Sequence, residues 1–204
     1  MLPKTKPMDE GYIKFKCILT KSNPPSPSLL MGLTKWRDKM HELGLIGIYD
    51  NGIGFGNISI RHGKNFIVSA SATGGLERLA PENYVVVTNY SLRDNSLECI
   101  GQANASSESM THAAIYEASP EAGAVIHVHN LKAWQALLGK VPTTTDVPYG
   151  TPEMAYETLR LLKEGATQKQ KIIVMAGHKE GIIAWGRDLD EAGKVILEKI
   201  VPLM

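Results

Sequence analysis

The order of apolar and polar positions predicts short strands mixed with amphipathic helices. Helices are expected over residues 28–43, 107–118, 130–138, 151–163 and 188–200, where apolar residues recur at helical spacing. Short strands are expected at residues 58–61, 66–69, 84–89, 123–128, 172–175 and 181–185. Helices and strands do not alternate regularly, which favours a mixed or antiparallel sheet covered by helices.

Local signals support the helix boundaries. Thr151 precedes a helical segment as a capping residue, with Pro152 at its first position, and Asp188 caps the last helix. Gly44 and Gly139 each follow the end of a predicted helix, where a glycine is the usual terminator.

The proline cluster at residues 22–28 divides the chain unevenly. Three prolines in four positions exclude a helix or a central strand there. Residues 12–18, before the cluster, partly alternate in polarity and predict an edge strand. We therefore treat residues 1–27 as an N-terminal extension and residues 28–204 as the main domain, since 204 residues fit one domain.

Composition excludes several classes of partner. The chain has 22 Lys and Arg against 21 Asp and Glu, so no uniform basic field exists to hold nucleic acid or an anionic membrane. There is no run of 18 apolar residues to span a bilayer, and the first residues do not resemble a signal peptide. Cys17 and Cys99 predict two buried thiols rather than a disulfide framework. A cytoplasmic location is expected.

Two histidines on one predicted strand form the strongest chemical signal. Strand side chains alternate between faces, so His127 and His129 point the same way, with Cβ atoms roughly 6–7 Å apart. His178 stands just past the apolar strand at 172–175. Three imidazoles with one open position are typical of a catalytic zinc site, and zinc is the commonest metal for such nitrogen ligands.

A structural interpretation of these histidines stays open, because a strand histidine is often satisfied by a backbone carbonyl. Sequence alone does not show that His178 converges with the other two. We interpret the three remaining histidines as structural or solvated: His41, His62 and His112.

The segment Ser106-Ser107-Glu108 precedes a predicted helix. Two hydroxyl groups beside the free amides of a first helical turn form a seat for an anion. Glu108 in that turn is either a plain partner of the helix dipole or a general acid/base beside a metal.

A glycine-rich loop runs from Asn51 to Asn57. Its glycines at 52, 54 and 56 do not fit the dinucleotide fingerprint, because the third is misplaced and a strand follows instead of a helix. The bare amides and Asn57 can bind a phosphate, as can the similar patch at residues 71–75. Glycine in both loops is equally consistent with tight turns alone.

Taken in order, these motifs resemble the class II aldolase/adducin family over about residues 33–197. The matching residues are Gly56-Asn57-Ile58-Ser59, Ala72-Thr73-Gly74, Ser106-Ser107-Glu108, His127-Val128-His129 and Ala176-Gly177-His178. The resemblance implies a three-layer α/β/α fold around a largely antiparallel mixed sheet. It also implies a homotetramer with active sites between subunits.

The resemblance implies roles for individual residues. His127, His129 and His178 would hold a divalent metal, usually zinc, and Glu108 would be the acid/base and a possible fourth ligand. The substrate phosphate would be seated by Asn57, Thr73, Gly74, Ser106 and Ser107. Aldolases of the family also use a tyrosine from the neighbouring subunit, and Tyr149 falls at that spacing.

The implied activity is that of a metal-dependent aldehyde-lyase. It would cleave or form a carbon–carbon bond in a small sugar phosphate through a metal-stabilised enediolate. Two alternatives are open: an epimerase or dehydratase on the same scaffold, for which Asp146 is a possible acid/base, and a non-catalytic, adducin-like oligomeric scaffold. Three histidines, Glu108 and both serines argue against the scaffold, which has no need of them.

Overall fold

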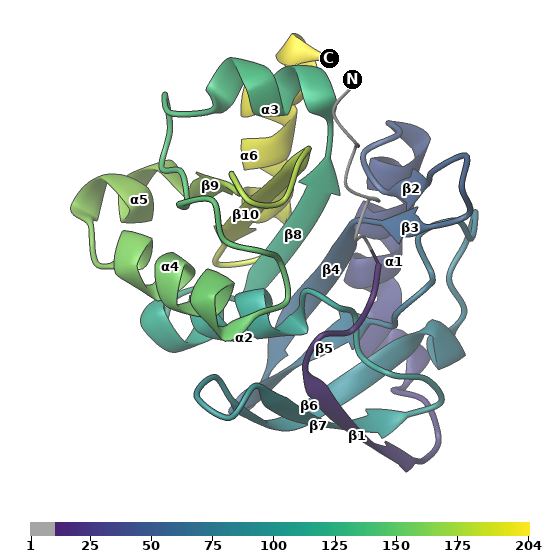
Figure 1. The fold of residues 1–204 in the computed structure, drawn as a ribbon. Coiled ribbons are helices and arrows are strands. Elements are labelled where there is room, and N and C mark those ends of the chain that lie inside the picture. The colour runs from purple at the N-terminus through teal and green to yellow at the C-terminus, as the bar shows by residue number, and fades with distance from the viewer. Residues whose placement is uncertain (1–10) are drawn as a thin grey trace, which may run out of the picture.

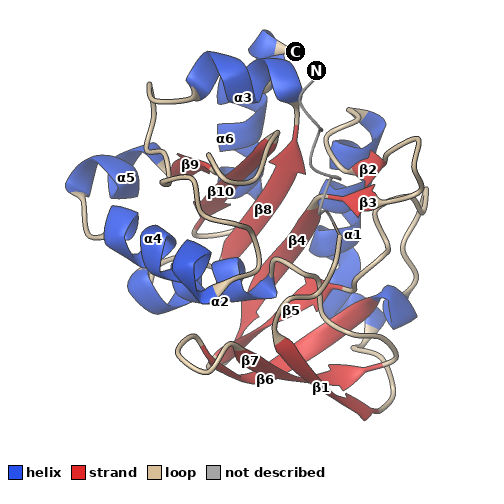
Figure 2. Cartoon of the chain, viewed as in Figure 1, coloured by secondary structure: helices blue, strands red, loops and turns tan. Residues whose placement is uncertain are grey.

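The computed structural model describes residues 11–204, which are built around one eight-stranded sheet (Figures 1 and 2). The strands lie in the order β1-β7-β6-β5-β4-β8-β10-β9, and every neighbouring pair is antiparallel except β1 and β7. Their bounds are β1 Lys16–Lys21, β4 Asn57–His62, β5 Asn65–Ser69, β6 Tyr84–Ser91, β7 Ser96–Gly101, β8 Ala124–His129, β9 Ile172–Val174 and β10 Gly181–Gly186. A separate hairpin joins β2 (Gly47–Ile48) to β3 (Gly54–Phe55).

Helices cover both faces of the sheet. Their bounds are α1 Pro27–Glu42, α2 Ser109–Ala118, α3 Leu131–Leu137, α4 Pro152–Leu162, α5 Gly165–Gln170 and α6 Leu189–Lys199. One core packs α2 and α4 against the sheet, and a second core packs α1 and α6 against the opposite face. The three-layer α/β/α fold expected from the sequence is confirmed.

Strand β8 lies between the two cores and is buried along its whole length. Val125 belongs to the core under α2 and α4, whereas Ala124, Ile126 and Val128 belong to the core under α1 and α6. Because strand side chains alternate with period 2, His127 and His129 lie on the same face as Val125. Both histidines therefore come to the end of the strand on the α2/α4 side.

The predicted helix caps at Thr151 and Asp188 are confirmed. Their side chains, and that of Asn130, accept hydrogen bonds from the third backbone amide that follows each of them. Helix α2 begins at Ser109, two residues later than predicted, so Glu108 stands at its N-cap rather than inside its first turn.

The expected edge strand forms four residues later than the alternation predicts. Strand β1 begins at Lys16, where pairing with Ser96 of β7 starts, and it lies at one end of the sheet. Residues 12–15 precede the strand, and Phe15 is buried in the core under α2 and α4. Strand β7 was not predicted, although Leu97 and Cys99 alternate with exposed Glu98 in it.

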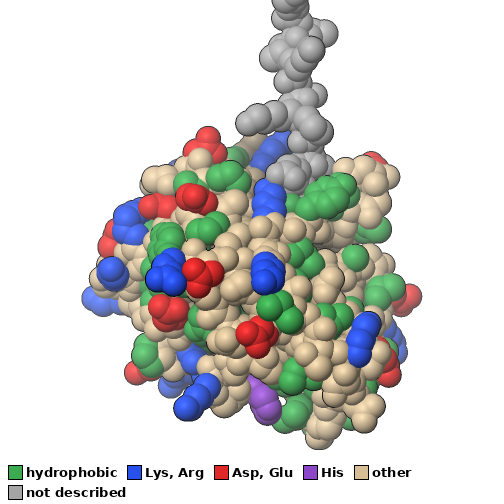
Figure 3. Space-filling model, turned by 60° about the horizontal axis from the view of Figure 1, so that its bottom comes forward, with side chains coloured by type: hydrophobic (Ala, Val, Ile, Leu, Met, Phe, Trp, Pro, Cys, Tyr) green, Lys and Arg blue, Asp and Glu red, His purple; other side chains and the backbone are tan. Residues whose placement is uncertain are grey.

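Surface charge is mixed in sign. Figure 3 shows Lys and Arg interspersed with Asp and Glu on the face presented there, as the near-zero net charge predicts. Between residues 11 and 204, every helix is too short or too polar to cross a bilayer.

Candidate metal and anion site

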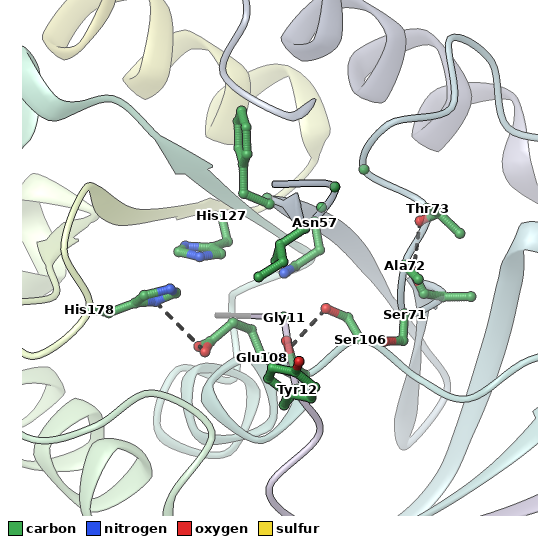
Figure 4. A pocket seen from close by; sticks show the side chains of 18 residues that line it. Gly11, Tyr12, Asn57, Ser71, Ala72, Thr73, Ser106, Glu108, His127 and His178 are labelled. Atoms are coloured by element: carbon green, nitrogen blue, oxygen red, sulfur yellow. Dashed lines mark hydrogen bonds and ion pairs between the residues drawn. The ribbon is translucent and has the colours of Figure 1, made fainter. Parts of the chain in front are cut away.

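Three imidazole rings converge at one end of the sheet. His127 and His129 come from β8, and His178 comes from the turn between β9 and β10. Figure 4 shows the rings of His127 and His178 side by side. One ligand nitrogen from each ring lies within 4.8 Å of the others, and all three side chains are buried. The convergence of His178 with the other two, which sequence left open, is thus present in the structure.

The turn that carries His178 depends on glycine. A Cβ atom at Gly181 would lie 2.9 Å from Nδ1 of the His178 ring, and one at Gly177 would lie 2.0 Å from the carbonyl oxygen of Val147. A larger residue at either position would displace the turn and with it the third imidazole.

Hydrogen bonds define the tautomers of the two strand histidines. Nδ1 of His127 lies 3.2 Å from the carbonyl oxygen of Ile182, which can only accept, so this nitrogen carries the proton. The Tyr49 hydroxyl donates to Oε2 of Glu180 at 3.1 Å and lies 2.8 Å from Nδ1 of His129. Because that hydroxyl proton is engaged with Glu180, its oxygen accepts from Nδ1 of His129.

Both strand histidines therefore present an unprotonated Nε2, and these two atoms are only 3.0 Å apart. Complete burial lowers the pKa of each ring well below the usual value of 6.5, and the neighbouring His178 ring lowers it further, so both are neutral at pH 7. Two lone pairs facing each other repel unless a cation lies between them. This donor set fits a divalent metal with nitrogen preference.

A buried carboxylate lies next to the imidazoles. Oε1 of Glu108 is 3.8 Å from Nδ1 of His178, and both side chains are about 2% exposed. The Thr111 hydroxyl, one turn along α2, donates to the other carboxylate oxygen at 2.8 Å. This bond fixes the carboxylate rotamer and leaves Oε1 on the side of the histidines.

A cavity of about 200 Å³ opens beside this cluster. It is smaller than the roughly 300–1,000 Å³ of pockets for drug-sized ligands, so it suits a compact molecule. All five residues predicted to seat a phosphate line it, together with Glu108, His127 and His178. The remaining wall is formed by Gly11, Tyr12, residues 52–56 and residues 70–72.

Asn57 lines the cavity next to the histidine cluster. It pairs with His127 across β4 and β8, and its side chain is 5% exposed. Among residues 11–204 its buried amide oxygen has no hydrogen-bond partner. Such an atom is rare in a folded protein and indicates a position where a ligand or water completes the site.

Two further residues that were given possible catalytic roles from the sequence lie outside the cavity lining. The buried Tyr149 ring stacks on His178 of its own chain, with centroids 4.7 Å apart, and its hydroxyl accepts from the Tyr12 amide at 3.1 Å. Tyr149 does not line the cavity. Asp146, considered as an epimerase-type acid/base, is exposed and also lies outside the cavity lining.

Sequence reasoning missed the residues that support the site. Tyr49 and Glu180 orient His129, and Thr111 orients Glu108. Thr111 lies three residues after Glu108, a helical spacing that could have suggested this contact. Tyr49 and Glu180 are 131 residues apart, and no pattern connects them.

The chain matches the sequence model of one protein family. The model described as "Class II Aldolase and Adducin N-terminal domain" matches residues 49–199. No curated protein matches the chain by sequence.

Several solved structures share the fold at low identity. An L-fuculose-1-phosphate aldolase from Thermus thermophilus is 21% identical, with a TM-score of 0.61, 87% of this chain covered and 91% of the other. YgbL from Escherichia coli, for which aldolase, epimerase and decarboxylase activities are all named, is 19% identical, with a TM-score of 0.64 and 86% of each chain covered.

Proposed function

Because this chain belongs to the class II aldolase and adducin family, we propose that it is a divalent-metal-dependent lyase acting on a small sugar phosphate. It would form or cleave a carbon–carbon bond next to a carbonyl group. The observation that carries the proposal is the pair of Nε2 atoms of His127 and His129, 3.0 Å apart, with His178 and the Glu108 carboxylate beside them. A scaffold without catalysis has no use for this arrangement.

His127, His129 and His178 would hold the cation, and zinc is the metal that their chemistry favours. When bound, such an ion supplies Lewis-acid polarisation of the carbonyl and hydroxyl oxygens of the substrate. Burial keeps the strand imidazoles neutral at pH 7, so no proton has to leave them before they coordinate.

Glu108 is the proposed acid/base. In the synthetic direction its carboxylate would take a proton from the hydroxymethyl carbon of dihydroxyacetone phosphate, leaving an enediolate that attacks an aldehyde. In cleavage the same carboxyl group returns the proton to that carbon. The Thr111 hydroxyl holds Oε2 throughout, so Oε1 is the oxygen that exchanges the proton.

The opposite end of the cavity would hold the phosphate. Ser106 and Ser107 stand before the N-terminus of α2, where free amides and the helix dipole favour an anion. Asn57, Thr73 and Gly74 complete this end of the cavity. The cavity volume of about 200 Å³ favours a short phosphorylated ketose over a large one.

We also propose a cytoplasmic homotetramer with sites shared between subunits, as the family resemblance implies. Tyr149 of a neighbouring subunit is the proposed acid/base for the hydroxyl group of the second substrate, because Tyr149 lies outside the cavity lining of its own chain. Light scattering on the purified protein tests the tetramer, and a monomer would contradict it.

The direct test of the reaction is proton exchange into dihydroxyacetone phosphate in deuterated water, followed by proton NMR. The proposal predicts exchange that requires zinc and stops when a chelator removes it. A protein that binds zinc but catalyses no exchange, with or without added aldehydes, would contradict lyase chemistry and favour the epimerase or dehydratase alternative. A protein that binds no metal would favour the scaffold.

A further inference from the structure

Arg37 on α1 is a buried cation that the proposed reaction does not use. Its side chain is 1% exposed, and the closest carboxylate, that of Asp38, is 3.6 Å away and partly exposed. Burial lowers the pKa of Arg37, and the Asp38 charge opposes this, but a guanidinium stays protonated inside proteins. Burying a charge costs more free energy than burying an apolar side chain of the same size, so compensating hydrogen bonds are expected around it.

Those contacts converge on one loop. The guanidinium donates to three carbonyl oxygens of the segment at residues 71–77, which we call the anion loop. The bonds go from Nη2 to Thr73 at 3.1 Å and to Gly74 at 2.9 Å, and from Nη1 to Glu77 at 2.8 Å. Thr73 and Gly74 are also two of the residues that line the proposed phosphate end of the cavity.

Because the peptide bond is planar, these carbonyl contacts also set the direction of the amide groups that follow them. In a trans peptide the carbonyl and the following N–H point in opposite directions. Because Arg37 holds the carbonyls of Thr73 and Gly74, the amides of Gly74 and Gly75 are directed away from α1. Successive amides that point the same way form a concavity that binds anions.

Packing on the loop leaves it little room to adopt another conformation. A Cβ atom at Gly74 would lie 2.3 Å from the carbonyl oxygen of Gly47 on β2 and 2.9 Å from the amide nitrogen of Phe55 on β3. The loop therefore touches the β2–β3 hairpin as closely as backbone allows, while Arg37 bonds its carbonyls.

We propose that Arg37 is a positioning residue for phosphate binding. Its guanidinium holds the anion loop so that the amide of Gly74, which lines the cavity, is available to the substrate phosphate. It also adds positive potential behind the loop in a low-dielectric environment. The proposal rests on the proposed function, because it assumes a phosphorylated substrate. It also extends the site beyond the matched residues 49–199 to helix α1.

Substitution separates positioning from simple structural support. R37M keeps the length of the side chain but removes the charge and all three hydrogen bonds, whereas R37K keeps the charge with fewer bonds. K35M is the matched control, because it removes one charge from an exposed position of the same helix. The measurements are inorganic phosphate affinity by calorimetry, zinc content, and KM and kcat for dihydroxyacetone phosphate exchange.

We expect R37M to bind inorganic phosphate at least tenfold more weakly and to raise KM by a similar factor. Its zinc content should match the wild type and its kcat should change less than twofold, since phosphate binding acts on ground and transition states alike. R37K should recover part of the affinity, and K35M should match the wild type. If R37M fails to fold, the phosphate affinities of R37K and K35M are compared instead. We then expect R37K to bind inorganic phosphate at least threefold more weakly than K35M.

Two results would overturn the proposal. Phosphate affinity within twofold of wild type in R37M, or in R37K if only that variant folds, would reduce Arg37 to structural support and leave the proposed function intact. A wild-type protein that binds neither inorganic phosphate nor dihydroxyacetone phosphate would overturn both this proposal and the phosphorylated substrate.

Discussion

The Nε2 atoms of His127 and His129 face each other at 3.0 Å, while both Nδ1 atoms are hydrogen bonded elsewhere. Rings arranged in this way cannot donate to one another without breaking a bond on their far side. The arrangement is stable when a cation lies between the two nitrogens.

Tyr49 should control the metal affinity although it does not touch the metal position. Y49F removes the hydroxyl that accepts from Nδ1 of His129, so this ring loses its fixed tautomer. Loss of such an outer partner typically costs about 10–100-fold in affinity, and we expect zinc to bind more weakly by that factor. Competition with a fluorescent chelator measures it. Y156F, at an exposed tyrosine on α4, is the control, and equal affinities in both variants would contradict the assignment.

Glu108 should be required for turnover but not for folding. E108Q keeps the shape and the contact with Thr111 but cannot take a proton, so exchange into dihydroxyacetone phosphate should fall by at least about 100-fold. Zinc content measured on the same sample should stay within twofold of wild type. E121Q, at an exposed glutamate between α2 and β8, should keep full activity. An E108Q protein with wild-type exchange would exclude the proposed acid/base role.

Buried histidines should make the metal-free protein unstable in acid. Burial lowers the pKa of His112 to about 3, and its Nδ1 lies 2.7 Å from the Ser59 hydroxyl. In the unfolded chain this group binds a proton below about pH 6.5, whereas the folded protein stays unprotonated, so stability falls as pH falls through that range. His127 and His129 act in the same direction.

The size of this effect is measurable by urea unfolding at pH 7 and pH 5. Each such histidine contributes about 1.4 kcal/mol per pH unit below 6.5, or about 2 kcal/mol by pH 5. H112N removes one titrating group and should reduce the loss between the two pH values by that amount. An unchanged pH dependence in H112N would contradict the neutral, buried state of this ring.

The two cysteines should differ in reactivity. Their sulfur atoms are 3.8 Å apart across β1 and β7, and the hydrogen bond between the thiols lowers the pKa of Cys17 to about 7 and raises that of Cys99. Iodoacetamide should alkylate half-buried Cys17 first, with a rate that rises up to about pH 7 and then levels off. In C99A the profile should move toward higher pH. Mass spectrometry follows the alkylation of each thiol. Equal rates for both thiols in the wild type would contradict the predicted difference in reactivity.

The sequence predicted the parts of the site that depend on local periodicity. The shared face of His127 and His129 follows from strand geometry, and most helix bounds agree with the apolar pattern within two residues. The start of β1 was misplaced because pairing with β7 determines it, and this pairing joins residues about 80 positions apart.

The supporting residues could not be predicted because their contacts arise only when distant segments meet. Tyr49 contacts His129, and Glu180 contacts Tyr49 from a distant part of the chain. Glu180 occupies a left-handed conformation with φ of 72° in the turn before β10. Arg37 on an amphipathic helix would ordinarily be solvent-exposed. Only the packing of the anion loop against α1 places it in the interior.

The central claim is that three imidazoles hold one cation, and X-ray absorption spectroscopy of the zinc-loaded protein tests it most directly. The account predicts one zinc per chain bound by three imidazole nitrogens at about 2.0–2.1 Å, and loss of this signature in H127A, H129A and H178A. A spectrum with fewer than three imidazoles, or one that H178A leaves unchanged, would contradict it.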